Sequence, residues 1–197
     1  CKYKSVSGTS VARDFVELPS QIMENWAFQK EVLAEYARHY ETGEVIPTEL
    51  VDRLTECGKY GQGFATTEYL AASLLDMDFH TLKQIPEGCN VVDFEQQTLG
   101  KRGLLKQIPP RYRTTYFNHT MGGGYTAGYY SYLWSEVLDA DAFELFKERG
   151  IFSRECGESF REEVLSKGGI RHPMELYVAF RGHKPDQKAL IERMGLE

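Results

Sequence analysis

Hydrophobic side chains recur at three- and four-residue intervals near the start of the chain. Four of them form one apolar stripe: Phe15, Leu18, Ile22 and Trp26. This spacing is typical of a helix that turns one face toward a core. We therefore predict a helix over residues 9–41, with a kink at Pro19, because proline removes one backbone hydrogen bond. A second stripe is polar and consists of Asp14, Glu17, Gln21 and Glu24. By spacing alone this polar stripe is a solvated face or a ligand carboxylate with supporting acids.

The same periodicity, with Gly and Pro residues between segments, predicts further helices. They cover residues 48–57, 66–79, 91–99, 125–149, 153–165, 173–181 and 185–194. Thr48 and Asp93 are the predicted caps of two of these helices, and Pro173 suits a first helical turn. The alternation typical of strands is missing, apart from a short irregular strand predicted near residues 111–118. The expected fold is mostly α with at most this minor β element, and 197 residues are expected to form one domain.

Composition narrows the class of protein and of partner. Hydrophobic residues make up 42% and charged residues 26% of the chain, which is ordinary for a globular protein. A net charge of -6 without a basic cluster argues against nucleic acid as a partner. No apolar run is long enough to cross a bilayer, so no membrane partner is expected. The four cysteines show no CxxC spacing, which favours free thiols in a reducing compartment and a cytoplasmic location.

The segment from His119 to Trp134 joins a histidine, three consecutive glycines and several tyrosines. If the part after Gly124 is helical, Tyr125, Tyr129 and Tyr132 lie on one face. Their hydroxyls would then form a row of hydrogen-bond donors suited to hold a peptide carbonyl and stabilise its oxyanion. An aromatic helix packed in a core, with its hydroxyls satisfied locally, explains the same pattern. The pattern leaves both interpretations open.

Motifs for common enzyme chemistry are missing from these residues. The sequence holds no nucleophile elbow, P-loop or dinucleotide fingerprint. No two of its five histidines are four residues apart: His39, His80, His119, His172 and His183. A zinc helix of the HExxH type is therefore not encoded here, and the residues alone form no complete metal site.

Two long motifs resemble signatures of one enzyme family. Residues 7–21, read Ser-Gly-Thr-Ser-Val-Ala-Arg-Asp-Phe-Val-Glu-Leu-Pro-Ser-Gln and followed by Glu24-Asn25-Trp26, resemble a signature of the thimet oligopeptidase family of zinc metallopeptidases. Residues 117–134 look like that family's substrate-binding loop and helix. Phe160-Arg161-Glu162 and Phe180-Arg181-Gly182 also resemble it. The extra glycine before Tyr125 and the C-terminal segment are most similar to the bacterial peptidyl-dipeptidase branch.

The resemblance implies a role for the acids near the start of the chain. Glu17 matches the family's third zinc ligand, and Asp14 and Glu24 are the acids expected to support it. In the family two histidines and the catalytic glutamate belong to an HExxH helix that precedes this signature. We therefore expect residues 1–197 to be the C-terminal part of a zincin-like catalytic domain whose HExxH part lies upstream of Cys1. Without it we predict no peptidase activity and weak or no zinc binding, since a lone carboxylate rarely holds zinc.

The resemblance also implies a substrate site. His119, Tyr125 and Tyr132 match residues that bind substrate and stabilise the tetrahedral intermediate, and Gly123 and Tyr129 are expected beside the substrate. The full-length protein would be a zinc metallopeptidase that hydrolyses short peptides and releases C-terminal dipeptides. The missing N-terminal part is an expected partner, and the apolar surface left by its absence predicts self-association. Two other classes stay open: a non-catalytic helical module that binds peptides or a protein, and a purely structural helical domain.

Overall fold

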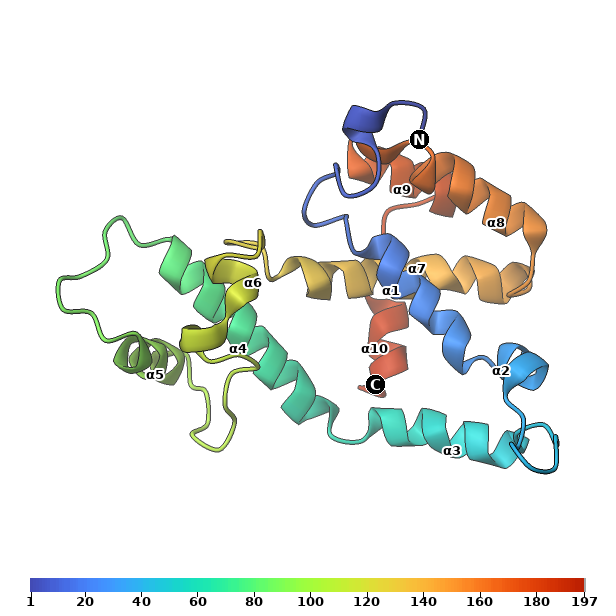
Figure 1. The fold of residues 1–197 in the computed structure, drawn as a ribbon, viewed down its shortest axis with the longest axis horizontal. Helices are drawn as coiled ribbons and strands as arrows, with labels where there is room; N and C mark the ends of the chain where they lie inside the picture. Colours follow the sequence, from blue (N-terminus) through green and yellow to red (C-terminus); the bar gives the residue numbers. More distant parts are fainter. Residues whose placement is uncertain (197) are drawn as a thin grey trace. The chain divides into compact units, whose positions relative to one another are not determined.

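The computed structural model describes residues 1–196, which form two compact units. Unit 1 joins Cys1–Tyr60 to Leu133–Glu197, and unit 2 is the single segment Gly61–Tyr132. The described part of the chain is helical, and its one β feature is an isolated antiparallel bridge between Arg38 and Val45 (Figure 1). The prediction of a mostly α fold is therefore confirmed.

Unit 1 contains most of the helices. In chain order they are η1 (Lys4–Val6), α1 (Leu18–Glu24), η2 (Asn25–Phe28), α2 (Lys30–Tyr36), α3 (Thr48–Lys59), α7 (Ser131–Arg149), α8 (Arg154–Phe160), the π-helical η4 (Arg161–Leu165), η5 (Gly168–Ile170), α9 (Pro173–Arg181) and α10 (Lys188–Met194). The boundary between the units falls within the first turn of α7, after Tyr132.

The core of unit 1 forms around α7, with α1, α8 and α9 contributing to it (Figure 1). Its buried members include Leu18, Ile22, Leu138, Phe143, Phe146, Phe160, Leu176 and Tyr177. Trp26 meets the rings of Phe143 and Phe146 edge-on, with both centroid distances at 4.7 Å. The Trp26 indole N–H donates to the carbonyl of Ile151 at 2.8 Å, so its one polar atom is satisfied at the edge of the core.

The long helix predicted over residues 9–41 is wrong. Residues 13–17 form a turn, and three short helices follow in place of one long helix: α1, η2 and α2. Pro19 lies in the first turn of α1, where its missing N–H interrupts no helical bond, so it begins a helix and does not kink one. The apolar stripe nevertheless faces the core, because Phe15, Leu18 and Ile22 are buried in it and the partly buried Trp26 packs against it.

Several helix ends match the sequence and others differ. Ser153 caps α8, Pro173 opens α9, and Gly182 ends α9 in the left-handed conformation. The last helix begins at Lys188 and not at Pro185.

Two predicted helix caps are wrong, one by a single residue and the other by three. Pro47 occupies the cap position before Thr48, and the Asn90 side chain caps α5 (Val91–Lys101) where Asp93 was expected. Asn90 lies one residue before the helix, so its side-chain oxygen Oδ1 accepts the amide hydrogens of Val92 and Asp93.

Unit 2 contains α4 (Gln62–His80), α5, η3 (Thr114–Tyr116) and α6 (Asn118–Met121). One of its apolar clusters joins α4 to α5 through Ala71, Leu75 and Leu99. A second cluster consists of Ala72, Phe117 and Tyr129. Both clusters are much smaller than the core of unit 1.

The strand predicted near residues 111–118 is also wrong, because this segment forms η3 and the start of α6. The buried carboxylate of Glu95 accepts the amide hydrogen of Thr114 at 2.8 Å and its hydroxyl at 2.9 Å. The backbone group that would join a strand ladder is therefore used by a side chain of α5.

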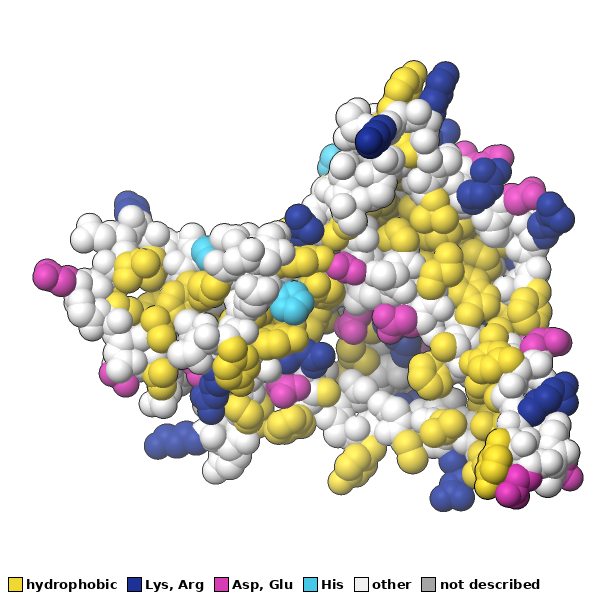
Figure 2. Space-filling model, in the orientation of Figure 1, with side chains coloured by type: hydrophobic (Ala, Val, Ile, Leu, Met, Phe, Trp, Pro, Cys, Tyr) yellow, Lys and Arg dark blue, Asp and Glu magenta, His cyan; other side chains and the backbone are white. Residues whose placement is uncertain are grey.

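Large hydrophobic side chains remain on the surface of both units (Figure 2). They include Phe28, Tyr36, Tyr40 and Tyr60 in unit 1 and Ile85, Leu105 and Tyr116 in unit 2. Exposed apolar area of this kind favours association, and self-association of the chain stays a prediction.

Candidate functional site

The tyrosine-rich segment of unit 2 is a loop before it becomes a helix. We define the tyrosine loop as residues 122–130; it consists of turns, and α7 begins only at Ser131. The prediction of a helix directly after Gly124 is therefore wrong. Within this loop Ala127 has a φ of 51°, in the left-handed region that non-glycine residues rarely adopt. Such a residue ends regular helix geometry, which explains why α7 starts late.

The four predicted side chains of unit 2 nevertheless converge. The ring of His119, on α6, lies 5.9 Å from Tyr125, 5.8 Å from Tyr129 and 6.3 Å from Tyr132, measured between centroids. Tyr125 and Tyr132 stack on each other at 5.0 Å with their planes 23° apart. We call these four residues the tyrosine–histidine cluster. The loop brings them together without the helical stripe that suggested them.

The members of the cluster differ in exposure, and this difference separates their roles. Tyr129 is only 3% exposed and packs edge-on against Phe117 at 5.0 Å. His119, Tyr125 and Tyr132 are half-buried, so part of each ring reaches solvent. Tyr129 therefore supports the cluster from beneath, and direct contact between Tyr129 and a substrate stays a prediction.

Burial also changes the acidity of Tyr129. Loss of solvation, with a smaller contribution from the neighbouring Tyr112, raises the pKa of Tyr129 to about 12. The Tyr129 hydroxyl is therefore protonated at neutral pH and remains a donor.

Gly123 is required by a close approach of the backbone. A Cβ atom at this position would lie 2.8 Å from the carbonyl oxygen of Asn118 and 3.0 Å from the Cα of His119. Its amide also donates to the Asn118 carbonyl, and the Tyr125 amide donates to the His119 carbonyl at 2.8 Å. Gly123 thus lets the tyrosine loop fold back on α6 and places His119 beside Tyr125. Contact of Gly123 with a substrate stays a prediction.

One residue that orders this loop was not found from the sequence. Asp76 on α4 is fully buried, and its two carboxylate oxygens accept the amide hydrogens of Ala127 at 3.0 Å and Tyr129 at 2.9 Å. The only signal in the sequence is an acid inside the apolar run from Leu74 to Met77. Helices often carry such an acid on a solvated face, so the signal alone does not identify a buried role.

The predicted zinc ligand lies in unit 1. Glu17 is half-buried at the residue before α1, and Ser20 donates its hydroxyl to the Glu17 carboxylate at 2.6 Å. A carboxylate oriented by such a hydrogen bond is suited to contribute one ligand to a metal. Asp14 is half-buried in the preceding turn, while Glu24 is exposed at the far end of α1. At 1.5 Å per residue, Glu24 lies about 10 Å from Glu17 along the helix axis.

A complete metal site is not formed by residues 1–196. Among them no three His, Cys, Asp or Glu side chains gather closely enough to hold an ion. Glu17 therefore fits a zinc site only as one ligand of several. Glu17 belongs to unit 1 and the tyrosine–histidine cluster to unit 2, and their participation in one site stays a prediction.

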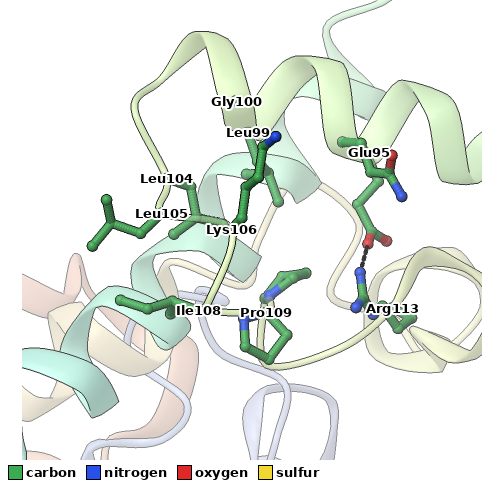
Figure 3. A pocket seen from close by; sticks show the side chains of 11 residues that line it. Glu95, Leu99, Gly100, Leu104, Leu105, Lys106, Ile108, Pro109 and Arg113 are labelled. Atoms are coloured by element: carbon green, nitrogen blue, oxygen red, sulfur yellow. Dashed lines mark hydrogen bonds and ion pairs between the residues drawn. The ribbon is translucent and has the colours of Figure 1, made fainter.

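A separate pocket of about 520 Å³ lies in unit 2, between α5 and the segment 104–110 (Figure 3). Apolar side chains such as Leu99, Leu104 and Ile108 line it, and the ion pair between Arg113 and Glu95, 2.7 Å long, closes one side. None of the predicted site residues lines this pocket. Separately, no helix within residues 1–196 combines the length and apolar character needed to span a membrane.

Comparison with known proteins gives the family. The family model described as Peptidase family M3 matches residues 1–196. Dipeptidyl carboxypeptidase of Salmonella typhimurium is 43% identical over the whole chain, which covers 29% of that relative. Oligopeptidase A of Escherichia coli is 42% identical over 98% of the chain and 28% of the relative, and a probable cytosolic oligopeptidase A of Arabidopsis thaliana is 36% identical over 93% and 27%. The chain thus spans about 29% of the length of the first of these relatives. The match along almost every residue confirms the resemblance seen in the two motifs, and the chain belongs to peptidase family M3.

Proposed function

We propose that a protein of the relatives' length that contains this chain is a zinc metallopeptidase that hydrolyses short peptides. Family membership and the peptidase names of its relatives support this proposal. The observation that carries it is the convergence in unit 2 of His119, Tyr125 and Tyr132, whose half-buried rings lie 5.0 to 6.3 Å from one another between centroids.

Residues of this chain would contribute both to zinc binding and to stabilisation of the transition state. Zinc, held in part by Glu17, would supply Lewis-acid polarisation of the scissile carbonyl. Asp14, in the turn before Glu17, would support the orientation of that ligand, and Glu24 would contribute negative charge from the far end of α1. The phenols of Tyr125 and Tyr132 would donate hydrogen bonds to the oxygen on which charge develops, with His119 as a third donor. Gly123 and Tyr129 would shape the wall along which the peptide lies.

We further propose that residues 1–197 alone hydrolyse no peptide. One carboxylate is a poor zinc site, whereas catalytic zinc is normally held by three protein ligands. The remaining ligands would come from a segment outside these residues, which would also be the main partner of this chain. Assay of the purified chain with a quenched peptide, together with its metal content, tests this. Chelator-sensitive hydrolysis at an ordinary enzyme rate would overturn it.

The role of the phenols is tested by Tyr132→Phe in the longer protein. Loss of one oxyanion donor should lower kcat by about a hundredfold, since such donors contribute a few kcal/mol to the transition state. The far-UV circular dichroism should not change, because the ring remains. A variant with normal kcat would favour a peptide-binding or structural role for the cluster.

A further proposal concerns the branch of the family to which the longer protein belongs, and so how it cleaves peptides. We propose release of C-terminal dipeptides, supported by the extra glycine before Tyr125, although the identities to dipeptidyl carboxypeptidase and oligopeptidase A are 43% and 42% and do not separate the two. Mass spectrometry of the products of one long peptide distinguishes stepwise loss of dipeptides from internal cleavage. We propose a cytoplasmic location, which the free state of all four cysteines supports.

A further inference from the structure

We propose that Asp76 is the positioning residue of the tyrosine loop: its carboxylate fixes the backbone at Ala127 and Tyr129, and this brings Tyr125 and Tyr132 into the tyrosine–histidine cluster. The inference rests on the proposed function for its consequence in catalysis. Its structural part depends only on contacts within unit 2.

The geometry of the contact is bidentate. Oδ1 of Asp76 accepts the Ala127 amide at 3.0 Å and Oδ2 accepts the Tyr129 amide at 2.9 Å. Asp76 has no solvent exposure, so water does not compete for either hydrogen bond. Hydrogen bonds to an ionised acceptor are shorter and stronger than those between neutral groups. Two amides two residues apart and directed at one carboxylate form a small anion-binding turn.

The loop needs such an acceptor because its backbone conformation is unfavourable. Ala127 has a φ of 51°, and a non-glycine residue keeps this conformation only where its surroundings determine it. The amide of Tyr129 is buried, and a buried donor without a partner is costly. The Asp76 carboxylate answers both needs, since it satisfies the Tyr129 amide and holds the turn at Ala127.

His80 makes a further contact to the Asp76 carboxylate. Its Nδ1 lies 2.8 Å from Oδ1 of Asp76 and 2.8 Å from the backbone oxygen of the same residue. One Nδ1–H donor directed at this pair restricts rotation of the Asp76 side chain. The chain of contacts therefore runs from His80 through Asp76 to the loop, and from the loop to the rings of Tyr125 and Tyr132.

Substitution of Asp76 by asparagine tests the structural part. Asp76→Asn keeps the size of the side chain, but its NH₂ group faces an amide that needs an acceptor. In the chain of residues 1–197, hydrogen exchange measured by NMR should accelerate at least about tenfold at the amides of Ala127 and Tyr129. The reason is that the substitution removes hydrogen bonds that protect these amides from exchange. Unchanged exchange at both amides would overturn the proposal.

The matched control is Asp78→Asn on the same helix. The carboxylate of Asp78 pairs with Arg102 at 2.6 Å, outside the tyrosine loop, so the same substitution should leave exchange in the loop unchanged. If Asp76→Asn does not fold, the double variant Asp76→Asn/Ala127→Gly replaces it, because glycine adopts positive φ without strain. Recovery of folding with exchange still fast at Tyr129 supports the proposal; slow exchange there overturns it.

Activity of the longer protein tests the consequence for catalysis. Asp76→Asn should lower kcat at least about tenfold with a smaller change in KM, because misplaced donors act mainly on the transition state. If Tyr132→Phe loses activity and Asp76→Asn does not, the positioning inference fails alone. If neither variant loses activity while exchange in the loop is accelerated, the proposed catalytic role of the tyrosine–histidine cluster fails and the positioning of the loop stands.

Discussion

Both units bury aspartates, and Asp139 in unit 1 and Asp76 in unit 2 do different work. In unit 1, Asp139 on α7 accepts from the guanidinium of Arg193 at 2.6 Å and from the amide of Asn25 at 2.9 Å. These partners are side chains of α10 and η2, so the contact ties together helices whose backbones are already satisfied. In unit 2, Asp76 accepts backbone amides of a loop. A carboxylate paired with side chains fastens elements, whereas one paired with amides determines the path of the chain.

The apolar cores of the two units also differ in size. Unit 1 has one large cluster centred on α7, and unit 2 has two small clusters. Apolar burial supplies most of the stabilising free energy of a domain, so burial stabilises unit 1 more than unit 2. The arrangement of unit 2 therefore depends more on individual polar contacts, and substitutions in the two units should have different consequences.

The largest effect is expected in the core of unit 1. Phe143 is 2% exposed and meets the edge of Trp26. Phe143→Ala should lower the free energy of unfolding by about 4 kcal/mol, from lost burial and the cavity left behind. Urea denaturation followed by circular dichroism measures this. A loss below about 1 kcal/mol would show that the core of unit 1 relaxes freely, contrary to its close packing.

The next largest effect is expected at Asp139, whose carboxylate joins helices of unit 1. Asp139→Ala should cost about 3 kcal/mol, because the Arg193 cation loses its partner in a partly buried position. The double variant Asp139→Leu/Arg193→Leu should recover much of this loss, since it leaves no unpaired charge. Urea unfolding of both variants makes the comparison. A double variant less stable than the single one would contradict this explanation, because the unpaired charge would then not be the cause of the loss.

A smaller effect is expected at the close approach in unit 2. Gly123→Ala would place a Cβ atom 2.8 Å from the Asn118 carbonyl oxygen, so the tyrosine loop must move at a cost of about 2 kcal/mol. The measurement is the chemical-shift change of loop amides, with Gly63→Ala as the control because nothing lies within 4 Å of a Cβ there. If the loop amides shift no more in Gly123→Ala than in Gly63→Ala, the result contradicts the close approach.

The smallest effect is the pH dependence caused by Tyr129. Its folded pKa is raised to about 12, so the folded state holds this proton more tightly than the unfolded state, where tyrosine ionises near pH 10. Stability is therefore fully present below about pH 10 and falls as the pH rises toward 12, by about 1 kcal/mol once solvent screening is allowed for. Tyr129→Phe should remove this part of the alkaline loss, measured by urea unfolding at pH 9 and 11. An unchanged slope would assign the alkaline loss to other groups, such as Tyr177, whose pKa is also raised by burial.

Several features of the candidate site were predictable from the sequence and others were not. The identity of His119, Tyr125 and Tyr132 as one group follows from their motif, and the structure brings their rings together. The helical stripe proposed to explain it is wrong, because Ala127 adopts a positive φ. Periodicity describes regular elements only, so it misplaces residues held by a turn.

The helical class, the apolar faces and the family can be read from the amino-acid sequence alone. These properties are carried by local spacing and by long ordered motifs, which exist before any folding. Three features depend on the folded chain and not on local sequence: where the first helix breaks, which residue caps α5 and how the tyrosine loop is held. The last of these depends on an acceptor 51 and 53 residues away from the amides it binds. No local pattern encodes a contact between groups that distant in the chain, because it forms only when α4 and the loop are packed together.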